Sequence, residues 1–177
     1  MQTTLIHPLN RPLRSLVVLL LSVLLVACNE AAQEPKILAP VAFHNSDECH
    51  VCGMIISGFP GPKGEAVGQE PVKKFCSTTE MLGWWLQPEN QQLDVTLYVH
   101  DMARSDWNRP DDAHLINARA AYFVLAPDLP GAMGVTLASF GDPTAAQQLA
   151  ESHAGQVLRL DDIDLTLLQQ SGTMAHP

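Results

Sequence analysis

Positive charge is scarce in this chain of 177 residues. Ten Lys and Arg residues stand against 19 Asp and Glu residues, which gives a formal net charge of −9 at pH 7. Proteins that bind nucleic acid or anionic lipid surfaces present clusters of basic side chains. The composition therefore argues against both kinds of partner, and we predict no nucleic acid binding.

Cysteine is also scarce, with four residues, of which only Cys49 and Cys52 form a Cys-x-x-Cys pair. A structural zinc site needs four good ligands, usually from two such pairs, and Cys76 has no Cys or His beside it. A thioredoxin-like site needs a strand that leads into a helix at the motif. The residues after Gly53 instead predict a strand. Nor does the sequence contain a recognisable Ser/His/Asp set or a phosphate-binding loop, so we expect no enzyme.

The first 27 residues have the features of a secretory signal. They contain no acidic residue, and Arg11 and Arg14 precede an apolar run from Leu16 to Val26. That run is too short to span a membrane as a permanent helix. We therefore predict that residues 1–27 are removed as a signal peptide.

The signal ends in Leu25-Val26-Ala27-Cys28, which resembles a bacterial lipobox. By that resemblance Cys28 is the acylated first residue of the mature protein, and residues 28–40 form the lipidated N-terminus and a flexible tether. We expect the protein on the periplasmic side, held to the membrane by its N-terminal lipid. Asn29 follows the cysteine, which favours the outer membrane. A cleaved signal followed by an unrelated cysteine is the alternative.

The segment Cys49-His50-Val51-Cys52-Gly53-Met54 places two thiols, an imidazole and a thioether within six residues. These ligands suit a soft cation, Cu(I) above all. With Cys28 acylated, three thiols remain, and an odd number in an oxidising compartment excludes a complete set of internal disulfides. The same spacing also serves in redox pairs. A thiol-disulfide protein in which Cys49 and Cys52 cycle therefore stays open.

Two helix starts are marked by capping residues. Ser77-Thr78-Thr79-Glu80 is a capping box, so Cys76 lies just before a helix, where the partial positive charge of the helix start lowers the pKa of a thiol. Asp142 followed by Pro143 predicts the second start. The bland interpretation of Cys76 is a small buried residue that closes a strand.

Short apolar segments flank these helices and predict strands. Before the first helix they are residues 52–56, 65–69 and 72–75, and residues 93–100 follow it. Residues 101–112 form a polar linker or loop, and residues 114–117 predict a strand after it. Around the second helix the predicted strands are residues 120–125, 135–140 and 155–160. Each half thus places a strand pair before a capped helix and a strand after it. We predict an α+β fold of two similar ββαβ units, residues 41–103 and 104–177.

Several elements together resemble the NosL family of copper-binding lipoproteins from nitrous oxide reductase gene clusters. They are the lipobox cysteine, the segment 47–54, Lys74-Phe75-Cys76, the segment 120–124, Met133-Gly134 and Ala138-Ser139-Phe140. The resemblance covers essentially all of the mature chain. It implies a duplicated ββαβ fold, also seen in alkylmercury lyase.

By the same resemblance, this protein is a metallochaperone that delivers Cu(I) for the copper centres of nitrous oxide reductase, working with a membrane transporter complex. Composition alone makes a lone methionine such as Met133 a core filler, but the resemblance makes it a ligand. The predicted metal ligands are Cys52, Met54, Met133 and Cys49. Cys76 and His50 are further candidates whose roles stay open.

Overall fold

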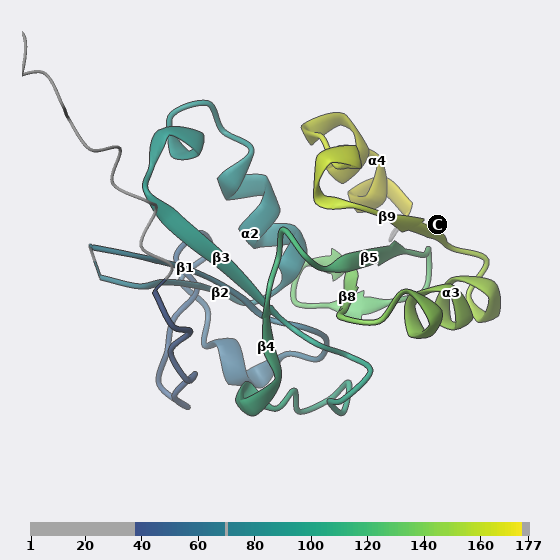
Figure 1. The fold of residues 1–177 in the computed structure, drawn as a ribbon, viewed down its shortest axis with the longest axis horizontal. Coiled ribbons are helices and arrows are strands. Elements are labelled where there is room, and N and C mark those ends of the chain that lie inside the picture. The colour runs from purple at the N-terminus through teal and green to yellow at the C-terminus, as the bar shows by residue number, and fades with distance from the viewer. Residues whose placement is uncertain (1–37, 70, 175–177) are drawn as a thin grey trace, which may run out of the picture. The chain divides into compact units, whose positions relative to one another are not determined.

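The structure, a computed structural model, describes residues 38–69 and 71–174 (Figure 1). The predicted signal peptide, the lipidation site Cys28 and most of the predicted tether lie outside these residues. Within the two ranges, no helix is both long enough and apolar enough to cross a membrane.

The first sheet has four strands in the order β2-β1-β3-β4, and neighbouring strands are antiparallel. The strands are β1 (Gly64–Gly68), β2 (Lys73–Phe75), β3 (Val95–His100) and β4 (Leu115–Asn117). They agree with the predicted strands at 65–69, 72–75 and 93–100 to within two residues. β4 lies beyond the predicted unit boundary at residue 103, yet it pairs with β3 and so extends the first sheet.

The second sheet has three antiparallel strands in the order β8-β5-β9. They are β5 (Tyr122–Leu125), β8 (Ala138–Phe140) and β9 (Gln156–Leu158). Between β5 and β8 the chain forms a hairpin of β6 (Pro130–Gly131) and β7 (Gly134–Val135), so Ala132 and Met133 form its turn.

In the part of the chain that the structure describes, three α-helices accompany the sheets: α2 (Thr78–Trp85), α3 (Pro143–Ser152) and α4 (Leu165–Met174). Both predicted caps are confirmed. The Ser77 hydroxyl accepts from the backbone N–H of Glu80 at 3.1 Å, and the Asp142 carboxylate accepts from two N–H groups of the first turn of α3. Short 3-10 helices occupy Ile56–Gly58, Asn90–Gln92, Asp112–His114 and Leu160–Asp162.

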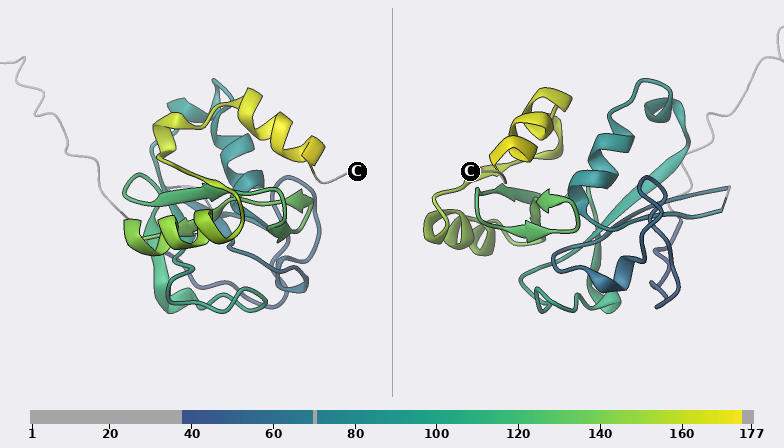
Figure 2. Two further views of the ribbon diagram at one scale, coloured as in Figure 1. Left: turned by 90° about the vertical axis from the view of Figure 1, so that its right-hand side faces the viewer. Right: turned by 180° about the vertical axis from the view of Figure 1, so that it is seen from behind.

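The two halves repeat one topology, which confirms the predicted α+β fold of two ββαβ units. In the first, β1 pairs on one side with β2 and on the other with β3, the strand that follows α2. In the second, β5 pairs with β8 and with β9, the strand that follows α3. Figure 2 shows the two sheets from the side and from behind.

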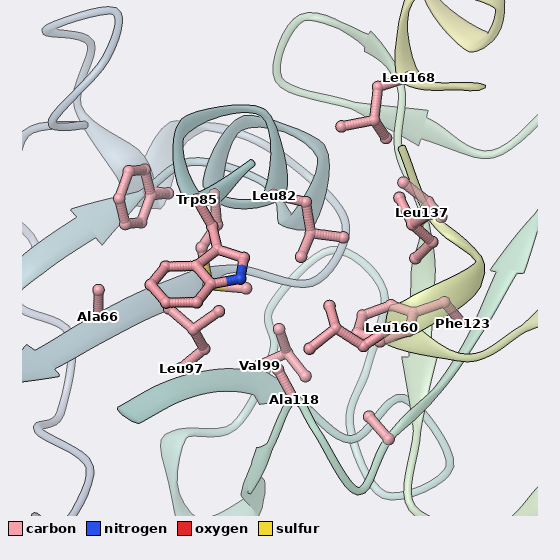
Figure 3. Close-up of a cluster of buried hydrophobic side chains, with 14 of the residues drawn as sticks. Ala66, Leu82, Trp85, Leu97, Val99, Ala118, Phe123, Leu137, Leu160 and Leu168 are labelled. Carbon is pink, nitrogen blue, oxygen red and sulfur yellow. The ribbon is translucent and has the colours of Figure 1, made fainter. Parts of the chain in front are cut away.

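The larger core surrounds α2, which lies between the first sheet and the second half of the chain (Figure 3). From the first half it takes Leu82 and Val99, and from the second Phe123, Leu137 and Leu160, all buried. A smaller core lies between the second sheet and α3. Thus α2 packs against apolar residues from both halves, whereas the strands that α3 contacts, β5, β8 and β9, belong to its own sheet.

Candidate metal centre

Residues 47–56 form a closed loop rather than the strand predicted for residues 52–56. The Cys49 N–H donates to the Met54 carbonyl and the Gly53 N–H donates to the Cys49 carbonyl, both at 2.8 Å. Gly53 has φ +71°, a left-handed conformation that glycine adopts without strain. The extended-strand prediction was therefore wrong, because backbone hydrogen bonds inside the loop turn the chain at Gly53.

The loop is attached to β2, an edge strand of the first sheet. The His50 N–H donates to the Lys74 carbonyl at 2.8 Å. The Lys74 ammonium donates to the Asp47 carboxylate at 2.5 Å and to the Ala42 carbonyl at 2.6 Å. These contacts bring the loop beside the end of β2, where Cys76 follows Phe75.

Three thiols meet at this point. The sulfur atoms of Cys49, Cys52 and Cys76 all lie within 4.8 Å of one another, and those of Cys52 and Cys76 are 3.6 Å apart. All three cysteines are free. Cys49 and Cys76 are buried and Cys52 is half-buried, so the cluster is closed on the core side, and Cys52 is its most exposed member.

Backbone groups treat the two buried thiols differently. Burial acts to raise the pKa of Cys49, but hydrogen bonds from backbone N–H groups, led by that of Cys52, outweigh it and lower the pKa. Burial, together with the neighbouring Cys49 and Cys52 thiols, raises the pKa of Cys76. The expectation that the helix start lowers the pKa of Cys76 was thus wrong, because desolvation dominates at a fully buried sulfur.

The other candidate ligands have different surroundings. The His50 ring makes edge contacts with Phe75 and Trp84, with 5.9 Å between ring centroids in each case, and burial lowers its pKa. Met54 is half-buried in the cysteine loop. Met133, in the turn of the β6–β7 hairpin, is 59% exposed, so it does not fill the core as composition alone favours.

The first sheet also buries ionisable groups that the sequence did not single out. Lys63, Glu65 and His100 are each less than 5% exposed. The Glu65 carboxylate accepts from the Val41 N–H at 2.8 Å, and burial raises its pKa to about 7. The predicted strands at residues 65–69 and 93–100 were the available signals, and they do not show that residues 41–43 cover one face of the sheet.

The spacing of the three sulfurs is suited to a metal. Three thiolates arranged trigonally around an ion at about 2.3 Å lie about 4 Å from one another. The sulfurs of Cys52 and Cys76 are 3.6 Å apart, and no pair of the three is more than 4.8 Å apart. The donor set is all sulfur, which suits soft and borderline ions and not magnesium or calcium. The fold and the cluster therefore define a small α+β protein with a candidate thiolate metal centre near its surface.

The sequence profile of the NosL family matches residues 40–168. The copper-binding lipoprotein NosL of Stutzerimonas stutzeri is 58% identical over 162 residues, which cover 92% of this chain and 85% of that protein. The protein of the same name from Achromobacter cycloclastes is 32% identical over 165 residues, covering 87% and 82%. This chain belongs to the NosL family, as the resemblance indicated.

A solved structure agrees with this assignment. The crystal structure of the copper chaperone NosL from Shewanella denitrificans superposes with a TM-score of 0.69 at 43% sequence identity. The match covers 72% of this chain and 97% of the crystallised one.

Proposed function

We propose that this protein is a lipid-anchored metallochaperone that binds Cu(I) at the thiol cluster. The observation that carries the proposal is the meeting of Cys49, Cys52 and Cys76 within 4.8 Å, all free. Relatives with matching chains are named copper-binding lipoproteins, and thiolates prefer Cu(I) among the ions of copper. The protein carries its ion and performs no catalysis.

The exposure of the ligands supports a role in transfer. A carrier needs tightly held sulfurs and at least one ligand that a partner can replace. Cys49 and Cys76 are the buried sulfurs, whereas Cys52 is half-buried and the proposed ligands Met54 and Met133 lie outside the core. We propose that a partner's sulfur or nitrogen first displaces Met133 or Met54, so that copper passes through a shared-ligand intermediate.

The family resemblance supplies the proposed destination. Copper goes to the copper centres of nitrous oxide reductase, with the help of a membrane transporter complex. Acylation of Cys28 holds the protein on the periplasmic side, in the outer membrane. The distance between a membrane anchor and the thiol cluster is then set by the tether at residues 28–40.

The test is a titration of the full-length chain, reduced and held in detergent, with Cu(I) against a competing chelator. We expect one tightly bound Cu(I) per chain and much weaker Zn(II) binding. A Cys52→Ser variant is expected to lose tight binding, and Ser57→Ala, in the neighbouring exposed 3-10 turn, is the control that should bind normally. Weak Cu(I) binding or a preference for Zn(II) by the unaltered protein would contradict the proposal.

A thiol-disulfide function is the second candidate, with Cys49 and Cys52 as the cycling pair. Cys76 is an alternative partner for Cys52, because their sulfurs lie 3.6 Å apart. A working redox couple would exchange with thiol reagents near the periplasmic potential. Mass spectrometry of the protein equilibrated in a glutathione series, followed by digestion, would identify whether Cys52 pairs with Cys49 or with Cys76 and the potential of that disulfide.

A further inference from the structure

Lys63 is a buried cation that has no carboxylate partner among residues 38–69 and 71–174. Its side chain is 4% exposed, and its ammonium donates to the carbonyl oxygens of Phe59 at 2.6 Å and Pro60 at 3.0 Å. Within the described residues it forms no salt bridge. Because burial of an unpaired charge is costly, this lysine calls for an anion that completes its surroundings.

The register of the first sheet places Lys63 beside the thiol cluster. β1 and β2 are antiparallel, with Gly64 opposite Phe75, so one further step along the pair sets Lys63 opposite Cys76. Side chains of directly opposite residues lie on the same face of a sheet. The backbone of Lys63 is held in this place by His100, whose Nδ1 accepts from the Lys63 N–H at 3.1 Å.

The electrostatics agree with this placement. Burial lowers the pKa of Lys63 to about 8, and a negative charge on Cys76 acts in the opposite direction and raises it. A negative charge at Cys76 thus stabilises the charged form of Lys63.

The charge of the loaded cluster depends on the ion. Three thiolates around Cu(I) carry a net charge of −2, whereas the same thiolates around Zn(II) carry −1. A fixed cation beside the cluster stabilises both complexes, but it stabilises the more negative one about twice as much. A buried lysine at this position thus favours a monovalent ion over a divalent ion held by the same sulfurs.

We propose that Lys63 is the counter-charge of the thiol cluster and a determinant of its selectivity for Cu(I) over Zn(II). The inference rests on the proposed function, because it requires that Cys49, Cys52 and Cys76 hold the ion. It assigns Lys63 a positioning and electrostatic role, without a bond to the metal. The buried ammonium destabilises the fold of the metal-free protein, and it becomes paired with the negatively charged cluster when copper binds.

The experiment compares Cu(I) and Zn(II) affinities of the full-length chain with those of Lys63→Gln, which keeps an amide donor for the carbonyl groups but removes the charge. Lys63→Arg keeps the charge. Arg104→Gln removes an equal charge from an exposed site and serves as the matched control. Circular dichroism verifies folding, and Lys63→Met replaces Lys63→Gln if the latter does not fold.

We expect Lys63→Gln to lose on the order of a hundredfold in Cu(I) affinity and on the order of tenfold in Zn(II) affinity, so that selectivity falls about tenfold. Lys63→Arg should keep the selectivity, and Arg104→Gln should change neither affinity. Equal losses for both ions, or none, would overturn the role of Lys63. If the unaltered protein does not bind Cu(I), the proposed function itself fails, which is a separate result.

Discussion

The two ββαβ units share a strand order. They differ in what packs against the face of each sheet that points away from the unit's own helix. In each unit a phenylalanine, Phe75 or Phe140, ends the strand before the helix and stands two residues before its N-cap. Phe75 pairs with Gly64 and Phe140 pairs with Tyr122. This common register aligns the two units residue by residue.

The aligned positions have contrasting chemistry. Stepping from the shared pairs along both sheets gives four equivalences: Lys63 with Ala121, Glu65 with Phe123, Cys76 with Gly141, and His100 with Leu160. All four residues of the first unit are buried, and so are the three side chains aligned with them other than that of the glycine. The topology therefore accepts apolar residues at every one of these places.

The aligned residues differ in chemistry because different segments cover this face of the sheet in the two units. In the second unit this face joins the core around α2, where Phe123 and Leu160 pack. In the first unit, α2 covers the opposite face of the sheet. Residues 41–43 lie over the face that carries Lys63, Glu65 and His100. There Glu65 accepts from the Val41 N–H and Asp112 accepts from the Phe43 N–H. In this repeated fold, one unit thus supplies apolar support, whereas the other buries charged groups beside the candidate metal centre.

The largest expected difference between aligned positions concerns copper. Cys76→Ser removes a buried sulfur, and we expect Cu(I) affinity to fall on the order of a thousandfold, about 4 kcal/mol. Gly141→Ala, at the aligned position, should leave the Cu(I) affinity unchanged. Its stability can still fall, because the new Cβ would lie 3.2 Å from the Asp101 carboxylate. Competition titrations with a chromophoric Cu(I) chelator measure both. Normal binding by Cys76→Ser would reduce Cys76 to a core residue.

Stability should show the reverse contrast at Glu65 and Phe123. Phe123 is fully buried in the core around α2, so Phe123→Ala should lower the free energy of unfolding by about 4 kcal/mol. Glu65→Ala removes no apolar packing of that size, and its cost should be smaller. Urea denaturation followed by tryptophan fluorescence measures both variants. A larger loss at Glu65 would mean that the buried carboxyl, and not the apolar face, holds the fold together.

The sequence was sufficient where structure is decided locally. The side chains of Ser77 and Asp142 satisfy N–H groups within their own first helical turns, so these two starts were predictable. The loop at Cys49 was not. Its turn depends on backbone hydrogen bonds between Cys49 and Met54 and on attachment to β2, and the local sequence pattern contains neither contact.

The sequence predicted the kinds of ligand at the candidate site, but only some of the residues that lie there. The Cys-x-x-Cys segment identified Cys49 and Cys52, but Cys76 stands apart in sequence and meets them because the loop that carries them is attached to β2, where the His50 N–H donates to the Lys74 carbonyl. Lys63 lies at the end of a glycine- and proline-rich stretch that reads as an exposed turn. The stretch is instead held by a contact distant in sequence, in which the Trp107 carbonyl accepts from the Gly61 N–H at 2.7 Å, and no local pattern contains this contact.

The first unit should also make the stability of the protein depend on pH, through the buried carboxyl of Glu65. Because burial raises the pKa of Glu65 from 4.5 to about 7, the folded state holds a proton that the unfolded state releases above pH 4.5. Its stabilising contribution is complete below pH 4.5 and is lost as the pH rises to about 7, a change of about 3 kcal/mol. Glu65→Gln should remove this part of the pH dependence in thermal unfolding measured from pH 4.5 to 7.5. An unchanged profile would mean that the carboxyl is hydrated in solution.

The smallest contrast lies in the two helix caps. Ser77 accepts one backbone N–H and is buried, whereas Asp142 accepts two, from Thr144 and Ala145, and carries a charge at the helix start. Either residue replaced by alanine should cost about 1 kcal/mol of unfolding free energy, and Asp142→Asn should cost only the charge interaction with the helix dipole, about 0.5 kcal/mol. High salt should reduce the Asp142→Asn effect and leave that of Ser77→Ala unchanged, as chemical denaturation at two salt concentrations would show.

Since the N-cap of α2 directly follows Cys76, only Ser77→Ala should also weaken Cu(I) binding. An equal effect from Asp142→Ala would mean that the two units are coupled through the shared core.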